Sequence, residues 1–351
     1  MNEGFRIHDR QVGLDHEPYV IAEMSGNHNQ SLDRALEILE AAHAAGAHAC
    51  KLQTYRGDTI TLDHDGPGFR IQGGLWAGRR LFELYEEAHT PWEWHEAIFR
   101  RGRELGISVF SSPFDETAVD FLESLGAPAY KIASPELVHL PLLKKVAATG
   151  KPILLSTGMA TVAEIDEAVR TVRAHGCRDM VLLKCTSTYP ASPLDTNLQT
   201  LGHMREMFGC HVGVSDHTMG VGVAVAAVAL GATVVEKHFT LRRVDGGVDS
   251  AFSMEPEEMK SLVVETARAW QALGKVRYGP TAAEVDSLPF RRSVYVAKDL
   301  KAGDILTTQN LRVVRPGFGL APSLFETLLG RKVACDVSMG TPMSWEFVGP
   351  I

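Results

Sequence analysis

The chain has 351 residues, of which 45% are hydrophobic and 22% are charged, and its formal net charge is −8. These values are typical of a globular protein with a large core, and the negative charge argues against nonspecific binding to nucleic acid or anionic membranes. No apolar run reaches the roughly 18 to 20 residues that span a bilayer, and the N-terminus does not resemble a secretory signal. Because the five cysteines are scattered and lack CxxC spacing, we expect reduced thiols, mostly small core residues, in a cytoplasmic protein.

Short apolar runs alternate with helical patterns along most of the sequence. The runs begin near residues 19, 47, 107, 129, 152, 180, 211 and 233. Between the first two, residues 31–45 show helical spacing, and Gly46 is suited to end that helix. Eight such units predict a (β/α)8 TIM barrel. An open doubly wound sheet is the alternative, but no glycine-rich dinucleotide fingerprint follows the first strand.

The helical patterns stop after Gly274, and this change predicts the domain organisation. Residues 1–273 are expected to form the barrel, 274–290 a linker, and 291–351 a small β-rich domain with short β-like runs and glycine turns. If the protein is an enzyme, the barrel is expected to be its catalytic domain. Within the barrel, the segment 55–90 is longer than an ordinary loop and rich in glycine and aromatic residues. Long insertions of this kind are often functional lids.

The stretch from Gly213 to Phe239 contains two strands, each followed by a polar cluster. His217 follows the first strand and His238 follows the second. Because neighbouring parallel strands end at the same face of a barrel, the two imidazoles are expected to share one site. Two neutral imidazoles backed by carboxylates suit a divalent metal ion.

Other polar residues follow the remaining strands and predict an anion site at the same face. The lysines are Lys51, Lys131 and Lys184, and the hydroxyl donors are Ser112, Ser134, Thr186, Ser187 and Ser215. Together they suit a phosphate and a carboxylate. The candidate acid, base or metal-shell carboxylates are Glu23, Glu136, Asp216, Glu236 and Asp249. Structural ion pairs are the alternative for the carboxylates, and a Schiff base is the alternative for Lys131 or Lys184.

Ten segments in order along nearly the whole sequence resemble the nonulosonate (sialic acid) synthase family. They are AEMSGNHNQS, KLQTY, FSSPFD, AYKIAS, LLSTGMAT, KCTSTYP, GVSDHT, EKHFT and, in the tail, RRSVYVAKDLKAGD and RPGFGL. The tail is similar to the family's antifreeze-like (SAF) domain. EMSGNHNQS, the insertion around Trp76 and the terminal PMSWEF resemble the pseudaminic acid branch, whereas the N-acetylneuraminate and legionaminate branches are the alternatives.

The resemblance implies condensation of phosphoenolpyruvate with the open-chain aldehyde of an acetamido sugar, with release of phosphate. It implies that Glu23 acts in catalysis and that His217 and His238 hold Mn²⁺ or Mg²⁺, with Co²⁺ as a third candidate. It also implies a homodimer in which each tail caps the other barrel and Arg315 contacts the sugar. The residues implied to hold phosphoenolpyruvate are Lys51, Ser112, Lys131, Ser134 and Ser215, and Ser187 stands where the sialic acid branch has an asparagine. The other residues expected at the substrate site are Gln53, Glu136, Lys184, Tyr189, Asp216, Glu236 and Asp249.

Two further expectations concern the class of protein and the insertion. A noncatalytic carbohydrate-binding protein is the alternative from another class, but such a protein has no need of a metal site and a phosphate site together. Trp76, in the insertion, is expected to pack over the 6-deoxy, 4-acetamido end of the sugar, where an aromatic surface accepts a methyl group.

Overall fold

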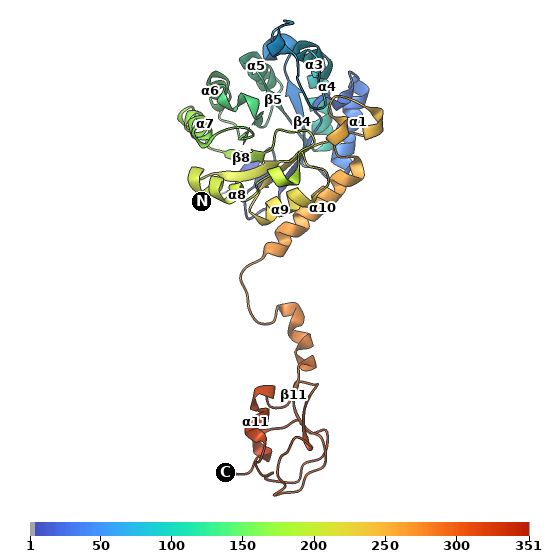
Figure 1. Ribbon diagram of the computed structural model, residues 1–351, viewed down its shortest axis with the longest axis vertical. Coiled ribbons are helices and arrows are strands. Elements are labelled where there is room, and N and C mark those ends of the chain that lie inside the picture. Colours follow the sequence, from blue (N-terminus) through green and yellow to red (C-terminus); the bar gives the residue numbers. More distant parts are fainter. Residues whose placement is uncertain (1–3, 351) are drawn as a thin grey trace. The chain divides into compact units, whose positions relative to one another are not determined.

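The computed structural model describes residues 4–350, which divide into two units between Gly274 and Lys275 (Figure 1). Each unit has its own buried apolar cluster. Within residues 4–350, no helix combines the length and the apolar character that a membrane crossing requires.

The first unit is a closed barrel of eight parallel strands in the order β10-β3-β4-β5-β6-β7-β8-β9. The bounds are β3 Tyr19–Glu23, β4 Ala49–Thr54, β5 Ser108–Pro113, β6 Tyr130–Ile132, β7 Ile153–Ser156, β8 Met180–Cys185, β9 His211–Ser215 and β10 Val234–His238. Each strand begins within two residues of its expected position, so the predicted (β/α)8 TIM barrel is confirmed.

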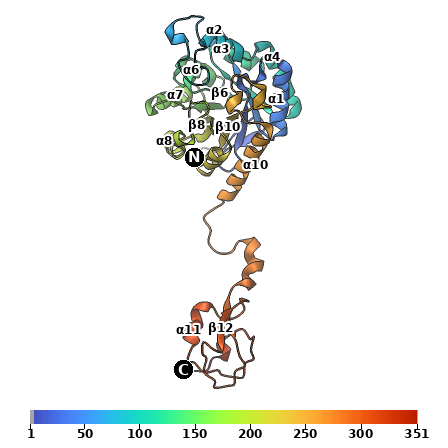
Figure 2. The same ribbon diagram turned by 45° about the vertical axis from the view of Figure 1, so that its right-hand side comes forward.

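Helices surround the strands in both views of the barrel (Figures 1 and 2). They are α1 Leu32–Ala44, α4 Trp92–Leu105, α5 Glu116–Ser124, α6 Leu140–Ala147, α7 Val162–Ala174, α8 Thr200–Phe208, α9 Gly222–Ala229 and α10 Pro256–Leu273. Their ends follow local chemistry: Ser31 caps α1 by accepting a hydrogen bond from the Arg34 amide, and Gly46 follows α1 with a φ of 85°.

Side chains alternate between the inside of the barrel and the layer beneath the helices. Tyr19 and Ile21 of β3 belong to the apolar cluster inside the barrel, whereas Val20 and Ala22 pack with residues of the surrounding helices. Because successive side chains on a strand point to opposite faces, Glu23 then lies on the inside. The same alternation decides which strand-end residues reach the site.

A short hairpin closes the end of the barrel at which the strands begin. Strands β1 Phe5–Ile7 and β2 Arg10–Val12 pair antiparallel, and Phe5, Ile7 and Val12 join the inner apolar cluster. The sequence analysis did not predict this hairpin, because its strands are only three residues long. Because the hairpin covers this end, a functional site is expected at the opposite end of the barrel, where the strands finish.

The remaining elements are short. The insertion contains α2 Gly57–Ile60 and α3 Leu81–Ala88. The second unit contains the antiparallel strands β11 Ser293–Val296 and β12 Leu311–Val314, and helix α11 Phe325–Leu328. The 3-10 helices are Ser25–His28, Pro67–Phe69, Pro135–Val138, Pro193–Asp195, Arg243–Asp245, Ser250–Phe252, Ala282–Phe290, Pro322–Leu324 and Trp345–Phe347. The second unit, Lys275–Ile351, includes residues 291–351, which were predicted as a small β-rich domain, and isolated bridges join its segments.

Candidate functional site

An open cavity lies where the barrel strands end, and the space between its lining residues, including the part open to solvent, is about 390 Å³. It is lined by Glu23, Lys51, Gln53, Ser112, Lys131, Ala133, Ser134, Pro135, Ser156, Cys185, Tyr189, Ser215, His217, Glu236 and His238. Ordinary strand alternation brings most of these residues together, because they follow inward-facing apolar residues by two or four positions. The barrel therefore collects polar groups from all eight strands or the loops after them into one cavity.

Two lysines and two glutamates form a buried charged network in the cavity. Lys51 Nζ lies 2.5 Å from Glu23 Oε2 and donates to Ser112 Oγ at 3.1 Å. Lys131 Nζ donates to Glu236 Oε1 at 3.0 Å, and Ser215 Oγ donates to the same oxygen at 3.0 Å. All four charged side chains are almost completely buried. Two buried ammonium groups beside hydroxyl donors can hold a phosphate or a carboxylate.

The two carboxyl groups of this network differ in pKa. Burial raises the pKa of Glu23 to about 7, although Lys51 opposes the change. Burial also acts to raise the pKa of Glu236, but Lys131 and Lys51 outweigh it and lower that pKa to about 2. Glu236 therefore stays ionised, whereas Glu23 can exchange a proton near neutral pH. Gln53 Nε2 donates to Glu23 Oε1 at 3.1 Å and orients it.

Three loops converge on Gly158, just after β7. The Gly158 amide donates to Ser134 Oγ at 3.0 Å. A Cβ atom at Gly158 would clash with both Ser134 Oγ and Ser187 Oγ, so only glycine fits between these hydroxyls. Ser187, which stands in place of the asparagine of the sialic acid branch, thus lies beside Ser134.

The two predicted metal ligands both line the cavity, and their ring centroids are 5.3 Å apart. His217 Nδ1 lies 2.9 Å from the Thr186 carbonyl oxygen, so Nε2 is the nitrogen that would bind a metal. His238 Nδ1 is buried without a hydrogen-bond partner. Burial, together with the positive groups around it, holds the pKa of His238 well below its usual value. A neutral imidazole with an unpartnered buried nitrogen fits a metal ion. Among residues 4–350, the histidines do not belong to a cluster of three or more ligand side chains, so any remaining ligands would come from substrate or water.

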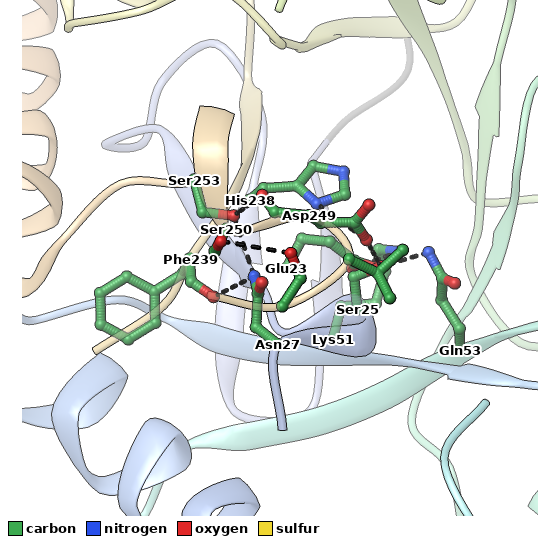
Figure 3. A network of polar contacts seen from close by, with 12 residues as sticks. Glu23, Ser25, Asn27, Lys51, Gln53, His238, Phe239, Asp249, Ser250 and Ser253 are labelled. Carbon is green, nitrogen blue, oxygen red and sulfur yellow. Dashed lines mark hydrogen bonds and ion pairs between the residues drawn. The ribbon is translucent and has the colours of Figure 1, made fainter. Parts of the chain in front are cut away.

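Asp249 connects His238 to the loop that follows β3 (Figure 3). Asp249 Oδ2 is 3.9 Å from His238 Nδ1 and accepts a hydrogen bond from Ser25 Oγ. Asn27 Nδ2 donates to Ser253 Oγ at 2.9 Å, and Ser253 Oγ donates to the Asp249 carbonyl at 2.7 Å. Burial raises the pKa of Asp249. This network holds the Asp249 carboxylate beside His238.

Cys185 lies beside His217 on the inner face of β8. Burial favours the neutral thiol, but the hydrogen bond to His217 and the charge of His217 outweigh it and lower the pKa of Cys185 to about 7. The same contact outweighs burial and raises the pKa of His217. The five cysteines were expected to be mostly small core residues, and Cys185 also lines the cavity.

The structure does not bring all the predicted residues into the cavity. Leu183 belongs to the inner apolar cluster, so the next residue, Lys184, faces outward, and its Nζ donates to the Cys185 carbonyl at 3.0 Å. Ser215 faces the cavity, so the next residue, Asp216, faces outward, where it pairs with Lys237. Both Lys184 and Asp216 line a separate, smaller hollow. The structure therefore does not bring these two side chains into the cavity lining, because strand side chains alternate between two faces.

Four other predicted residues also lie outside the cavity lining, and two of them, Ser187 and Asp249, are described above. Glu136 belongs to the 3-10 helix after β6, where its Oε2 is buried without a hydrogen-bond partner and burial raises its pKa to about 7. Arg315 belongs to the second unit and is exposed. Conversely, the sequence analysis missed Ser156, whose buried, unpartnered Oγ lines the cavity. Ser156 ends β7 as Ser112 and Ser215 lie at the ends of β5 and β9, so the same rule applied to every strand would have found it.

Comparisons with known proteins identify the relatives of this chain. Residues 38–278 match the NeuB family, and residues 291–348 match the SAF domain. The sequence is 42% identical over 333 residues to the pseudaminic acid synthase of Campylobacter jejuni, covering 94% of this protein and 97% of that one. It is 36% identical over 335 residues to the N,N'-diacetyllegionaminic acid synthase of Legionella pneumophila, covering 94% of each. The solved N-acetylneuraminic acid synthetase of Leptospira borgpetersenii is similar at 29% identity and a TM-score of 0.73, covering 82% of this protein and 95% of that one.

Proposed function

This chain belongs to the NeuB family, and from that premise we propose that it condenses phosphoenolpyruvate with 2,4-diacetamido-2,4,6-trideoxy-L-altrose to give pseudaminic acid and phosphate. One observation carries the proposal: a single cavity joins buried lysines and serines to a pair of histidines. Ser215 and His217 are two residues apart, at the end of the same strand and just beyond it, and both line that cavity. An anion and an aldehyde held there would be in contact.

Phosphoenolpyruvate is assigned to the lysine side of the cavity. Lys51 and Lys131 supply the positive charge, and Ser112, Ser134 and Ser215 supply hydroxyl donors. In the free protein each lysine is already paired with a glutamate, so a bound anion finds ammonium groups whose positions are fixed in advance. In the proposed binding mode, C3 of the enol points toward the histidines.

The sugar aldehyde is assigned to the histidine side. His217 and His238 would hold Mn²⁺ or Mg²⁺, with Co²⁺ as a third candidate, and such an ion supplies Lewis-acid polarisation of an aldehyde oxygen. The hydrogen bond from His217 Nδ1 to the Thr186 carbonyl fixes the ring that presents Nε2. Asp249 places a carboxylate 3.9 Å from His238 Nδ1, which is too far for a hydrogen bond.

Glu23 is the proposed general base. When C3 of phosphoenolpyruvate attacks the aldehyde carbon, C2 becomes electron-poor and is captured by water. A carboxylate with a pKa of about 7 can accept the proton of that water, and Glu236, which remains ionised, stabilises the positive charge that develops at C2. Phosphate then leaves by cleavage of the C2–O bond.

The second unit is proposed to act on the barrel of a second copy, in a homodimer. Arg315 is exposed in the RPGFG loop, and Phe318 of the same loop has 67% of its surface exposed. An exposed arginine next to an exposed aromatic residue suits contact with a partner's substrate. Arg315→Ala is then expected to raise the KM for the sugar much more than the KM for phosphoenolpyruvate. Equal effects on both would contradict a sugar contact.

The proposed reaction belongs in the cytoplasm. The five cysteines are unpaired, four of them buried, which is compatible with a reducing compartment.

A sugar panel tests the proposed function. Phosphate release from phosphoenolpyruvate is measured with the diacetamido trideoxy altrose, the corresponding legionaminic precursor and N-acetylmannosamine, each with Mn²⁺ and after chelation. We expect metal-dependent release that is fastest with the first sugar. Fastest release with one of the others would reassign the protein to the legionaminate or N-acetylneuraminate branch. Release with none of them would support a noncatalytic carbohydrate-binding protein.

A further inference from the structure

Three aromatic side chains from three different loops gather above the histidine pair. Tyr189 lies 4.4 Å from His217 between ring centroids, and Phe252 lies 4.9 Å from His238. Tyr189 and Phe252 are 5.1 Å apart. Trp76 of the insertion lies 5.6 Å from Tyr189 and 6.5 Å from Phe252. We call Trp76, Tyr189 and Phe252 the aromatic wall.

Trp76 is fixed in this wall by a specific hydrogen bond. Its Nε1 donates to the Val248 carbonyl oxygen at 3.0 Å, which ties the insertion to the loop between β10 and α10. Its neighbour Leu75, by contrast, has half of its surface exposed, and the glycines on either side of this pair are also exposed. The insertion thus places one large side chain beside the site while its surroundings remain in solvent.

The chemistry of the two substrates indicates what the wall contacts. Phosphoenolpyruvate is small and highly charged, and in the proposed site its charged groups bind the lysines and serines on the other side of the cavity. A diacetamido trideoxy sugar has apolar parts, namely acetyl methyl groups, the C–H groups of its carbon skeleton and a terminal methyl. Aromatic faces pack against such groups while excluding water.

The order of the rings fixes which part of the sugar reaches Trp76. Tyr189 and Phe252 contact the histidines, where the aldehyde carbon must lie. Trp76 contacts those two rings and so lies one ring further from the reacting carbon. An extended sugar leaving the histidines along the wall would therefore present its carbons remote from the aldehyde to Trp76.

We propose that Trp76 is a specificity-determining residue that recognises the 4-acetamido and 6-methyl end of the sugar. This inference rests on the proposed function and deepens it by assigning a residue of the insertion to one part of the substrate. Replacing a fitted apolar contact alters discrimination between similar substrates by about 10-fold or more.

The test compares two sugars and three variants. For wild type, Trp76→Ala, Trp76→Phe and Leu75→Ala, kcat/KM is measured with the diacetamido trideoxy altrose and with N-acetylmannosamine, which has hydroxyl groups at C4 and C6. We expect Trp76→Ala to lower the ratio of the two values by about 10-fold or more, with the KM for phosphoenolpyruvate unchanged. Trp76→Phe retains an apolar face and should keep most of the preference. Leu75→Ala is the matched control from the same segment and should behave as wild type.

The outcomes separate the two proposals. If wild type prefers the diacetamido sugar but Trp76→Ala keeps the same ratio, the proposed function stands and the role of Trp76 is wrong. Trp76→Ala and Trp76→Phe could instead both lower kcat/KM equally for the two sugars. In that case Trp76 only anchors the insertion through its hydrogen bond to Val248 and does not contact the distinguishing groups of the sugar. If wild type prefers N-acetylmannosamine, the proposed function itself fails, and the assignment of Trp76 fails with it.

Discussion

Lys237 Nζ lies 2.8 Å from Asp216 Oδ2, in a buried ion pair between the ends of β9 and β10. Each of these residues immediately precedes one histidine of the site. Because strand side chains alternate, the ion pair lies behind the barrel wall while His217 and His238 face the cavity. Lys237 also donates to the Thr218 carbonyl at 2.6 Å, and the Thr218 amide donates to Asp216. The pair therefore fixes the two segments whose spacing sets the distance between the histidines.

Breaking this ion pair should weaken both the fold and metal binding. Lys237→Met leaves Asp216 as an uncompensated buried charge, so we expect the free energy of unfolding to fall by about 3–5 kcal/mol. The double variant with Asp216→Asn should regain most of that stability, because no charge is then left unpaired. Mn²⁺ affinity, measured from free Mn²⁺ by electron paramagnetic resonance, should remain lower in both. Wild-type affinity in the stable double variant would show that the pair does not position the histidines.

A surface pair provides the control for that experiment. Lys301 and Asp336 are 2.7 Å apart in the second unit, and both side chains are largely exposed. Exposed pairs of this kind contribute little, so Lys301→Met should leave the melting temperature and Mn²⁺ affinity unchanged.

Glu23→Gln tests the proposed base. The amide keeps nearly the same shape but cannot accept the proton of water, so kcat should fall by about 100-fold or more. Binding of phosphoenolpyruvate and Mn²⁺, measured by calorimetry, should persist. In wild type, kcat/KM should rise with pH to a plateau above about pH 7, because the ionised form is the base and burial raises the pKa of Glu23 to about 7. Near-normal turnover of the variant would remove Glu23 from the mechanism.

Gly158→Ala tests the phosphate side of the cavity. The added methyl group would displace the hydroxyls of Ser134 and Ser187, so we expect the KM for phosphoenolpyruvate to rise by about 10-fold or more, with a much smaller change for the sugar. Gly202→Ala is the control, since a Cβ there would meet nothing within 4 Å. If both variants have wild-type kinetics, phosphoenolpyruvate does not contact the hydroxyl groups of Ser134 and Ser187.

The buried carboxyl group of Glu136 should make the free energy of unfolding depend on pH. Burial raises its pKa from 4.5 to about 7, so the neutral acid stabilises the fold at low pH, and this contribution is lost as the pH rises from 4.5 through 7. Glu136→Gln should therefore be more stable than wild type by about 1–3 kcal/mol at about pH 8.5, with the difference disappearing toward about pH 4.5. Urea unfolding at several pH values measures this. A difference that grows in acid would contradict a buried neutral carboxyl group.

The barrel was predictable because its signals are local. Each strand is a short apolar run, and each helix that follows carries apolar spacing and an end signal such as Gly46. The hairpin of β1 and β2 was not predictable in this way, because three-residue strands carry too little periodicity and are held by packing against Tyr19 and Val234.

The site was predictable only up to the direction in which each side chain points. Glu23, Lys51, Lys131 and the two histidines follow inward-facing residues, and the structure brings them together. Lys184 and Asp216 occupy equally prominent sequence positions but fall on the other face. The contacts of Trp76 with Tyr189 and Phe252 join segments more than 100 residues apart in the sequence, and no local pattern specifies them.

The most direct test of the whole account follows the bridging oxygen of phosphoenolpyruvate. The enzyme is incubated with Mn²⁺, the diacetamido trideoxy altrose and phosphoenolpyruvate labelled with ¹⁸O between C2 and phosphorus, and the phosphate is examined by ³¹P resonance. The account predicts one labelled phosphate for each nine-carbon acid formed, because the C2–O bond breaks. Phosphate released without the label, or released without formation of the acid, would contradict it.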